Sequence, residues 1–154
     1  MGRKTNITLI GMPASGKSSV GVVLAKRLGK RFVDTDIVIQ EKYGKLLKEL
    51  IEEHGDDGFR EIEDEVNASL DVTDSIISPG GSVVYGEKAM KHLKEISVVI
   101  YLELSYTAIK SRLGDLRERG ITLKEGQTLK ENTALCKVCG YHSQRDEKNF
   151  VKDH

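Results

Sequence analysis

The sequence predicts an α/β fold with three layers, in which a central parallel sheet lies between two layers of helices. Three segments rich in β-branched and aliphatic residues, at 7–10, 75–78 and 96–102, have the length and composition of buried strands, and 31–34 is a weaker candidate. Between these segments, apolar residues recur at steps of three and four, as on one face of a helix. Short buried strands that alternate with helices are typical of a parallel sheet covered on both faces.

The expected helices are defined by their apolar positions and by their ends. Three groups of apolar residues have helical spacing: Val20, Val23, Leu24 and Leu28; Leu46, Leu47, Leu50 and Ile51; and Ile62, Val66 and Leu70. Gly29 occupies the place of a C-cap glycine after the first group. Pro13 and Pro79 each follow the end of an expected strand, where turns belong. After about Thr128 the hydrophobic periodicity fades.

The composition is that of one folded domain. The 154 residues suffice for one sizeable core, and 24 Lys and Arg residues balance 24 Asp and Glu residues. A net charge of zero disfavours nucleic-acid and membrane-surface partners, and the apolar runs are far shorter than the roughly 20 residues that span a bilayer. Residues 1–6 lead into a strand pattern without a signal-peptide core, and two Cys residues give no disulfide framework. We therefore expect a cytoplasmic protein, and we expect a monomer.

Residues 11–18, Gly-Met-Pro-Ala-Ser-Gly-Lys-Ser, match the phosphate-loop pattern GxxxxGK[ST] and directly follow the first strand. In such a loop the glycines let backbone N–H groups turn toward phosphate oxygens, and the N-terminus of the next helix attracts the anion. Lys17 would bind the terminal phosphates, and the Ser18 hydroxyl would coordinate Mg²⁺. The alternative is an accidental glycine-rich turn, but four fixed positions between a strand and a helix rarely coincide. The pattern predicts nucleotide binding without specifying the reaction.

Two carboxylates, Asp34 and Asp36, end the second strand. Ligands gather at the carboxyl ends of parallel strands, so both side chains should face the crevice that holds the phosphates. Alternation along an extended segment would send them to the same side, where one could hold Mg²⁺ through water and the other could accept a hydroxyl proton. The alternative is a helix N-cap followed by an acidic residue in the first turn, since the apolar segment 37–39 comes next.

Arg60 is the only Lys or Arg within residues 49–87, and most of its neighbours in the sequence are acidic. A lone guanidinium next to Phe59 could clamp a carboxylate through two hydrogen bonds. The alternative is a solvated helix face on which Arg60 pairs with Asp56 or Asp64. The sequence does not decide between the two.

Two glycine-containing segments are further candidates for ligand contact. Gly80 and Gly81 follow the third strand, where paired glycines permit close approach of the backbone, and an ordinary tight turn is the alternative. Residues 112–120, Arg-Leu-Gly-Asp-Leu-Arg-Glu-Arg-Gly, have the features of a lid that closes over phosphates and excludes water. A plain exposed charged loop is the alternative for the second segment.

Taken in this order, these segments resemble the shikimate kinase family. The matching segments are GMPASGKSSVG, DTD, FREIE, PGGS and the arginine-bearing lid, and the resemblance covers roughly residues 5–130. It implies a P-loop kinase domain over residues 1–130, with three α/β/α layers and a lid at about 112–126. It also implies a transferase that uses ATP and Mg²⁺ to phosphorylate the 3-hydroxyl of shikimate, in aromatic amino acid biosynthesis.

The resemblance assigns roles to particular residues. The ATP site would consist of Gly11, Ala14, Ser15, Gly16, Lys17, Ser18, Ser19 and Arg119, with Arg117 as the alternative lid arginine. The Mg²⁺ ligands would be Ser18 and Asp34, and the shikimate site would consist of Asp36, Arg60, Gly80, Gly81 and Ser82. The catalytic residues would be Lys17, Asp36 and Arg119, with Asp36 as the candidate base. Arg60 would pair with the substrate carboxylate.

Two positions depart from the family pattern. Ser82 stands where the family usually has a third glycine, and we expect it to tune the site modestly. The family follows its lid with an Arg-x-Pro-Leu-Tyr segment, whose arginine joins Arg60 on the substrate carboxylate, and then with a last strand and helix. Residues 131–142 lack that segment. We therefore expect 131–154 to be an atypical and poorly ordered tail that leaves the sheet without its last strand.

A frameshift would account for this tail. Read one nucleotide later, permitted codons for residues 131–142 spell Arg-Ile-Pro-Leu-Tyr-Ala-Lys-Tyr-Ala-Asp-Ile. We hypothesise that the chain from about Glu131 is a frameshifted translation that impairs turnover. Cys136 and Cys139, with His142 nearby, form a single CxxC pair. Such a pair is a weak signal for a metal site, because structural zinc normally needs four ligands.

The residues leave two other functions open. One is another P-loop small-molecule kinase, directed at gluconate or at a nucleotide. Asp36, Arg60 and the Gly80–Gly81 turn favour a small hydroxylated acid instead. The other is a nucleotide-binding protein without kinase turnover.

Overall fold

The computed structural model describes residues 3–12, 15–103, 107 and 150–152. In chain order its elements are β1 (Asn6–Ile10), α1 (Lys17–Leu28), β2 (Arg31–Asp34), α2 (Thr35–Tyr43), α3 (Leu47–Ala68), β3 (Ser75–Ser78), the 3₁₀ turn η1 (Val83–Tyr85), α4 (Glu87–Ile96), β4 (Ser97–Glu103) and β5 (Phe150–Lys152). The four strands expected from the sequence are all present, and each begins and ends within one residue of its expected position.

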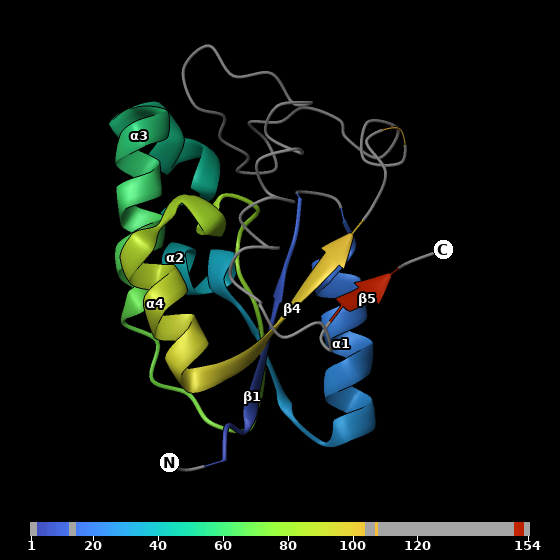
Figure 1. Cartoon of the computed structure of the whole chain (residues 1–154). Coiled ribbons are helices and arrows are strands. Elements are labelled where there is room, and N and C mark those ends of the chain that lie inside the picture. The colour runs from blue at the N-terminus through green and yellow to red at the C-terminus, as the bar shows by residue number, and fades with distance from the viewer. Residues whose placement is uncertain (1–2, 13–14, 104–106, 108–149, 153–154) are drawn as a thin grey trace.

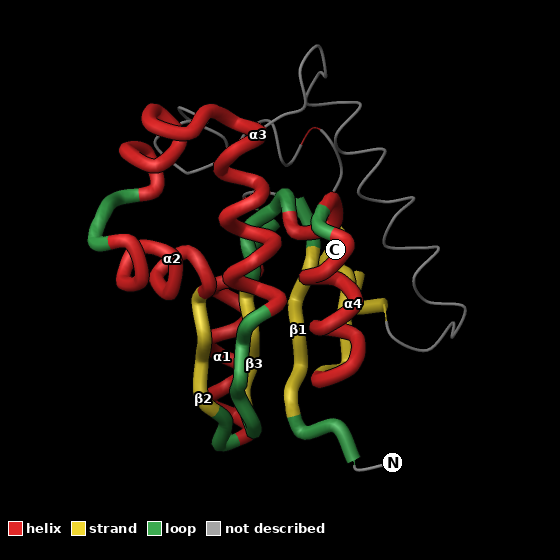
Figure 2. Tube along the Cα trace, turned by 90° about the vertical axis from the view of Figure 1, so that its left-hand side faces the viewer, coloured by secondary structure: helices red, strands yellow, loops and turns green. Residues whose placement is uncertain are grey.

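The strands form one parallel sheet in the order β2-β3-β1-β4-β5. Figure 1 labels β1, β4 and β5, and Figure 2 labels β2, β3 and β1. Because the sheet is parallel, the carboxyl ends of its strands lie together at one end of the sheet, its carboxyl end, where open α/β sheets bind their ligands. β1 pairs with β3 on one side and with β4 on the other, so the loop after Ile10 begins in the middle of the carboxyl end.

Helices cover both faces of the sheet, which confirms the three-layer prediction (Figure 2). On one face α1 packs over Leu9 and Ile76 through the small residue Ala25. On the other face α4 packs through Leu93 over Ile77. α3 packs against α4 and against α2, and its contact with α2 forms a second apolar cluster on that side. The side chains of that cluster are Ile39, Leu47, Leu50, Ile51, Phe59, Ile62 and Val66.

The apolar positions expected for the first helix are mostly exposed. Val23 is 57% exposed and Leu28 is 50% exposed, and Val20 is also exposed. Leu24 of that group does pack against the core. The fully buried positions on this face include the small residues Gly21 and Ala25. A Cβ on Gly21 would lie 2.6 Å from the ring of Phe32, so the absence of a side chain there lets α1 approach the sheet closely.

The second and third apolar groups fall mainly on one long helix, α3, and their expected burial is confirmed except at Leu46. Leu46 occupies the N-cap position and is 62% exposed, while Leu47 begins the helix and is buried. Gly55 interrupts α3 with a φ of 72°, a left-handed conformation that favours glycine. This kink separates the first turns of α3 from the part that carries Arg60.

The expectation that the tail contributes no last strand was wrong for residues 150–152. These residues form β5, which pairs with β4 in parallel, with Phe150 opposite Tyr101 and Lys152 opposite Glu103. Phe and Val favour strands, and β4 would otherwise present its unpaired backbone groups at the sheet edge. The rest of the tail lies outside the described residues.

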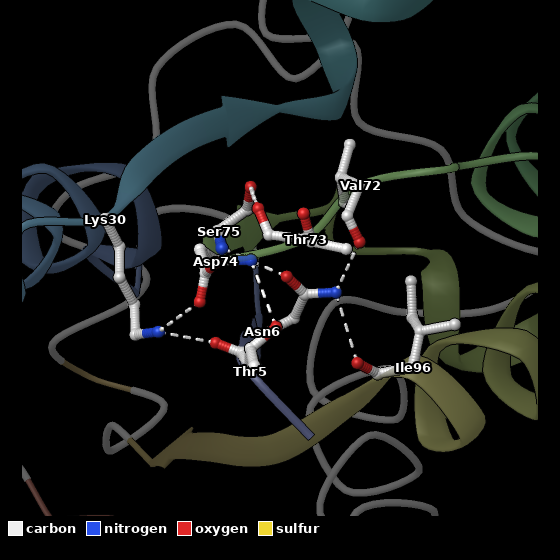
Figure 3. Close-up of polar contacts among 8 residues, drawn as sticks. All are labelled: Thr5, Asn6, Lys30, Val72, Thr73, Asp74, Ser75 and Ile96. Atoms are coloured by element: carbon white, nitrogen blue, oxygen red, sulfur yellow. Dashed lines mark hydrogen bonds and ion pairs between the residues drawn. The ribbon is translucent and has the colours of Figure 1, made fainter. Parts of the chain in front are cut away.

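Polar contacts connect the chain segments at the other end of the sheet, where β1, β3 and β4 begin (Figure 3). The buried Asn6 amide donates to Val72 O at 2.7 Å and to Ile96 O at 3.1 Å, and its Oδ1 accepts from Ser75 N at 3.0 Å. One side chain therefore joins the chain segments that lead into β3 and β4. Lys30 Nζ adds a hydrogen bond to Thr5 O at 2.6 Å. These contacts stabilise the sheet at the end opposite to the carboxyl ends of its strands.

Candidate active site

The residues that match the phosphate-loop pattern follow β1 at the carboxyl end of the sheet and lead into α1. Gly11 has a φ of 155°, and a Cβ there would lie 2.7 Å from Leu102 O on the neighbouring strand. Gly16 is the N-cap of α1 with a φ of 91°, which is left-handed backbone. Both positions therefore require glycine. Gly16 directly precedes α1, and the unpaired N–H groups of the first turn of that helix favour an anion.

Lys17 lies in the first turn of α1, and its side chain folds back over the loop. Its Nζ donates to Gly11 O at 3.0 Å and to Met12 O at 2.8 Å, and the residue is only 8% exposed. The ammonium therefore lies beside the backbone of the phosphate loop. A positive charge at a helix N-terminus is suited to the terminal phosphates of a nucleotide.

The start of α2 determines the positions of Asp34 and Asp36, whereas the sequence predicted that alternation along an extended segment would do so. Asp34 is the N-cap of α2, and its Oδ1 accepts from the backbone N–H of Asp36 at 3.0 Å. The N-cap alternative is thus confirmed. The prediction that both side chains lie on one extended segment was wrong, because Asp36 already belongs to the first turn of α2. The other oxygen of Asp34, Oδ2, lies 3.4 Å from Ser18 Oγ, so this carboxylate borders the phosphate loop.

Asp36 is half-buried, and its carboxyl group lies against the turn that follows β3. A Cβ on Gly80 would lie 3.3 Å from its Oδ1, so glycine is what lets the turn approach this carboxyl. The pKa of Asp36 is raised to about 6, chiefly by removal from water and also by the neighbouring Asp34, while Lys17 opposes the rise. At neutral pH the carboxylate is mainly ionised and can accept a proton from a hydroxyl.

Arg60 lies in the part of α3 that follows the kink at Gly55. The alternative that Arg60 belongs to a solvated helix face was wrong. Its side chain is only 12% exposed. NH1 lies 3.4 Å from Asp57 Oδ1, and the guanidinium lies 5.4 Å from the centre of the Tyr85 ring. A stacked, partly buried guanidinium is oriented before any ligand arrives, which favours bidentate binding of a carboxylate.

A hollow between α3 and η1 brings together Arg60 and Ser82, which were predicted site residues, with others to which the sequence assigned no role. Its lining residues are Arg60, Glu61, Glu63, Asp64, Ser82, Val83, Tyr85 and Gly86. Glu63 is 3% exposed, and its Oε2 accepts a hydrogen bond from Ser82 Oγ. The sequence carried one usable signal, since Glu63 follows Phe59 and Ile62 on the buried stripe of α3.

Comparison with known proteins identifies the family. A sequence model described as shikimate kinase matches residues 13–149. The shikimate kinase of Geobacter sulfurreducens is 39% identical over 131 residues, which are 84% of this chain and 72% of that protein. The chain belongs to the shikimate kinase family. The shikimate kinase of Bacillus anthracis is 37% identical over 120 residues, which are 78% of this chain and 73% of that protein. The family match extends past residue 130, where we expected the resemblance to end.

Solved structures agree with this family and with its fold. The shikimate kinase of Aquifex aeolicus has a TM-score of 0.72 at 28% identity, covering 96% of this chain and 86% of that chain. The shikimate kinase of Acinetobacter baumannii in complex with shikimate has a TM-score of 0.77 at 22% identity, covering 97% and 83%. The second likeness supports the fold alone. Shikimate kinases are phosphotransferases that use ATP.

Mg²⁺ commonly accompanies ATP in kinases, and the residues beside the phosphate loop fit it. Across 3–12, 15–103 and the short described pieces beyond, no group of three or more His, Cys, Asp or Glu side chains is arranged to hold a metal ion. Mg²⁺ usually takes only one or two protein ligands, together with waters and substrate phosphates. The Ser18 hydroxyl and the Asp34 carboxylate are oxygen donors of the kind that this ion prefers.

Several predicted site residues lie outside the described residues. They are Ala14, Arg117, Arg119, the lid at 112–126, and Cys136, Cys139 and His142. Among the residues that are described, no helix has both the length and the apolar composition needed to cross a membrane.

Proposed function

We propose that this shikimate kinase transfers the γ-phosphoryl group of ATP to the 3-hydroxyl of shikimate, giving shikimate 3-phosphate and ADP. One observation carries the proposal beyond family membership. Glu63 lines a hollow together with Arg60, and a Cβ on Gly80 would meet both Glu63 Oε1 and Asp36 Oδ1. Asp34, which caps the helix of Asp36, lies 3.4 Å from the hydroxyl of Ser18, the residue that follows Lys17. A phosphate-binding cation, a proton acceptor and a carboxylate-binding cation therefore converge on one crevice. Shikimate, an acid with hydroxyl groups, needs the last two, and ATP needs the first.

The nucleotide would occupy the loop from Gly11 to Ser19. Backbone N–H groups of the loop and of the first turn of α1 would hold the phosphate oxygens, and Lys17 would bind the terminal phosphates. Ser18 and Asp34 would hold Mg²⁺, which neutralises charge on the phosphates when bound. Arg119 of the lid is proposed as a further contact to ATP.

The acceptor would lie between α2, α3 and the turn after β3. Arg60 would form two hydrogen bonds with the substrate carboxylate, and Asp36 would bind the reacting hydroxyl. Gly80, Gly81 and Ser82 would border the acceptor. A Cβ on Gly80 would overlap Glu63 Oε1, which supports a close approach of this turn to the carboxyl groups of Glu63 and Asp36.

In the transfer step the shikimate oxygen attacks the γ-phosphorus in line with the leaving ADP oxygen. The new O–P bond forms as the bond between the γ-phosphorus and the β–γ bridging oxygen breaks, and the bonding electrons leave with ADP. Asp36 accepts the hydroxyl proton, and Lys17 stabilises the charge on the phosphoryl oxygens. Positioning and charge neutralisation thus carry the catalysis, because phosphoryl transfer requires little covalent chemistry from the protein.

An assay of acceptor-dependent ADP release tests the proposed function. The protein, ATP and Mg²⁺ are combined with shikimate, gluconate or a nucleoside monophosphate in parallel reactions. We expect ADP release that saturates with shikimate alone. Saturation with gluconate or with a nucleotide would assign another kinase specificity, and ATP binding without any acceptor-dependent ADP would indicate a protein without turnover.

We propose that the enzyme acts in the cytoplasm as a monomer and without a nucleic-acid partner. The cytoplasm supplies ATP, and the balanced charge of 24 basic and 24 acidic residues gives no attraction to polyanions. Size-exclusion chromatography with light scattering is expected to return the mass of one chain.

Replacing Arg60 with methionine is expected to raise the KM for shikimate about 10- to 150-fold, the value of one charge-assisted contact. The KM for ATP should stay unchanged, because the proposal assigns Arg60 to the acceptor and not to the nucleotide. Steady-state kinetics measures both constants. Lys48→Met removes an exposed cation from the same helix and should leave both unchanged. An unchanged KM for shikimate in Arg60→Met would contradict the assignment of the carboxylate to Arg60.

We further propose that the sequence from about Glu131 lowers turnover, because it supplies no second arginine for the substrate carboxylate. A chain read in the shifted frame after residue 130 is expected to bind shikimate about 10- to 150-fold more tightly, with similar affinity for ATP. Calorimetric titration of the two chains compares them directly. Equal shikimate affinity and turnover would contradict this proposal, as would gene codons that are incompatible with the shifted reading.

A further inference from the structure

Asp64 of α3 caps the start of another helix, α4. The residue at the N-cap position of α4 is Gly86, which has no side chain that could accept a hydrogen bond. Asp64 Oδ1 accepts from the backbone N–H of Ala89 at 2.7 Å, and Ala89 is the third residue of α4. This N–H group has no partner within its own helix, and a negative charge is favourable at a helix N-terminus. A side chain from α3 therefore holds the first turn of α4.

Gly86 permits this contact. A Cβ on Gly86 would overlap Asp64 Oδ1 and would lie 3.0 Å from its Cγ. A side chain at this position would therefore displace the Asp64 carboxylate from the end of the helix. α3 packs against α4 (Figure 1), and Asp64 and Gly86 set how closely α3 approaches the start of α4.

The segment from Gly80 to Gly86 connects this cap to the proposed acceptor site. Three backbone hydrogen bonds make it a compact turn: Val83 N donates to Gly80 O at 3.2 Å, Tyr85 N to Ser82 O at 3.0 Å, and Gly86 N to Val83 O at 3.0 Å. The side chain of Val83 is buried in the core. The turn is thus anchored in the core at Val83 and connected to α3 through the first turn of α4.

Tyr85 lies at the end of this turn and contacts Arg60 of α3. The guanidinium lies 5.4 Å from the centre of the Tyr85 ring, and NH1 lies 3.4 Å from Asp57 Oδ1. Arg60, Asp64, Tyr85 and Gly86 line the same hollow. Arg60 and Asp64 are four residues apart on α3 and therefore lie on the same side of the helix. The helix that carries the guanidinium also fixes the segment that carries the ring.

We propose that Tyr85 and Asp64 are positioning residues for the acceptor: the Tyr85 ring orients the Arg60 guanidinium, and Asp64 holds Tyr85 in place by capping α4. The inference rests on the proposed function, in which Arg60 binds the substrate carboxylate. Neither Tyr85 nor Asp64 needs to touch the substrate. A guanidinium that is oriented before the substrate arrives loses less conformational entropy on binding, so both residues act on the affinity for the acceptor.

Substitutions of Tyr85 test the role of the ring. Tyr85→Leu keeps an apolar side chain but removes the ring. We expect it to raise the KM for shikimate about 5- to 30-fold, the value of a partly buried contact between a guanidinium and an aromatic ring, and to leave the KM for ATP unchanged. Tyr85→Phe keeps the ring and should retain both wild-type constants. An equal rise in Tyr85→Phe would contradict the role of the ring, because it would assign the effect to the hydroxyl.

Substitutions of Asp64 test the cap. Asp64→Ala should raise the KM for shikimate about two- to fivefold, up to the value of a typical N-cap, and leave the KM for ATP unchanged. Asp64→Asn keeps an oxygen that accepts from the N–H of Ala89 and should restore the wild-type KM. A direct effect of the Asp64 charge on Arg60 would not be restored by asparagine, so failure of this rescue would contradict the cap.

Glu49→Ala is the matched control for loss of a cap. Glu49 Oε2 accepts from the backbone N–H of Leu46 at 2.7 Å at the start of α3, so this variant also loses a carboxylate that caps a helix. It should lower the thermal midpoint as Asp64→Ala does, but it should leave both KM values unchanged. A lowered midpoint with a wild-type KM for shikimate in Asp64→Ala would mean that the cap only stabilises the fold, and would overturn the inference.

The double variant tests whether Asp64 acts through Tyr85. In the Tyr85→Leu background, Asp64→Ala should leave the KM for shikimate unchanged, because the ring that the cap holds is already absent. A KM that is raised by the product of the two single effects would refute this connection. A wild-type KM in Tyr85→Leu would refute the inference as a whole.

NMR of the Arg60 side chain supplies a readout that needs no turnover. The resonance of its Nε–H group is assigned from its loss in Arg60→Met, and a nearby aromatic ring shifts it. We expect the chemical shift to change in Tyr85→Leu and in Asp64→Ala, and to stay unchanged in Glu49→Ala. If the wild type releases no shikimate-dependent ADP, the substrate part of the inference fails together with the proposed function. The orientation of Arg60 is then decided by NMR alone, and a resonance that Tyr85→Leu leaves unchanged would refute it.

Discussion

Replacing Lys17 with methionine is expected to lower kcat for shikimate phosphorylation by about 10²- to 10³-fold, the usual loss for a preorganised group that stabilises developing charge. Lys17 is buried beside the loop and lies at the N-terminus of α1, so no other described cation takes the same position at the phosphates. Methionine keeps the length and apolar character of the side chain but removes the charge. The coupled ADP assay measures kcat, and calorimetry measures the affinity for ATP.

A matched control and a folding test accompany this substitution. Lys26→Met removes an exposed cation from the last turn of the same helix and should leave kcat unchanged. Because Lys17 Nζ also binds Gly11 O and Met12 O, the thermal midpoint of Lys17→Met has to be compared with that of the wild type. A folded Lys17→Met protein that retains wild-type kcat would refute the assignment of the phosphate site to this loop.

Replacing Asp36 with asparagine is expected to lower kcat by about 10²- to 10⁴-fold, the range for loss of a general base. Asparagine has nearly the same shape and still contacts the substrate hydroxyl, but it does not accept the proton. The affinity for ATP should change little, because Asp36 faces Gly80 and the acceptor side of the crevice. Single-turnover kinetics measures the transfer step, and ATP titration measures the nucleotide affinity.

Glu41→Gln is the control for Asp36→Asn, since it removes an exposed carboxylate from the same helix, α2. It should have wild-type kinetics. If Asp36→Asn reduced ATP affinity as strongly as it reduced kcat, Asp36 would belong to the nucleotide site. Wild-type kcat in Asp36→Asn would remove it from the mechanism.

Local sequence patterns were sufficient to predict β1 to β4 and the phosphate loop, but not β5. β1, β3 and β4 are short aliphatic runs, and Gly16 is required by its own left-handed backbone. Gly11 belongs to the same local pattern, although the atom that excludes a side chain there is Leu102 O on a neighbouring strand. The face of α1 could not be predicted in the same way. Its buried side consists of small residues, because Gly21 must fit against Phe32 from a different element. Apolar spacing indicates the more hydrophobic side of a helix, and in α1 that side is mostly exposed, with only Leu24 of the group packed against the core.

The acceptor side of the site was only partly predictable for a related reason. Arg60 stood out as a lone cation in an acidic stretch, but its burial depends on Tyr85, which comes 25 residues later in the chain. Glu63 stands among several acids, and its place after Phe59 and Ile62 on the buried stripe of α3 is the only local sign of its burial. Its contacts with Ser82 and Gly80 arise only in the fold, because these residues lie in the turn after β3.

The central claim is that the crevice of Lys17, Asp36 and Arg60 passes phosphate to the 3-hydroxyl of shikimate. Phosphorus NMR of a reaction with ATP, Mg²⁺ and shikimate tests it most directly. The account predicts one new phosphomonoester resonance, coupled to the proton on C3 of shikimate, that grows in step with ADP. Formation of ADP with inorganic phosphate alone, or a phosphate on a different hydroxyl, would contradict it.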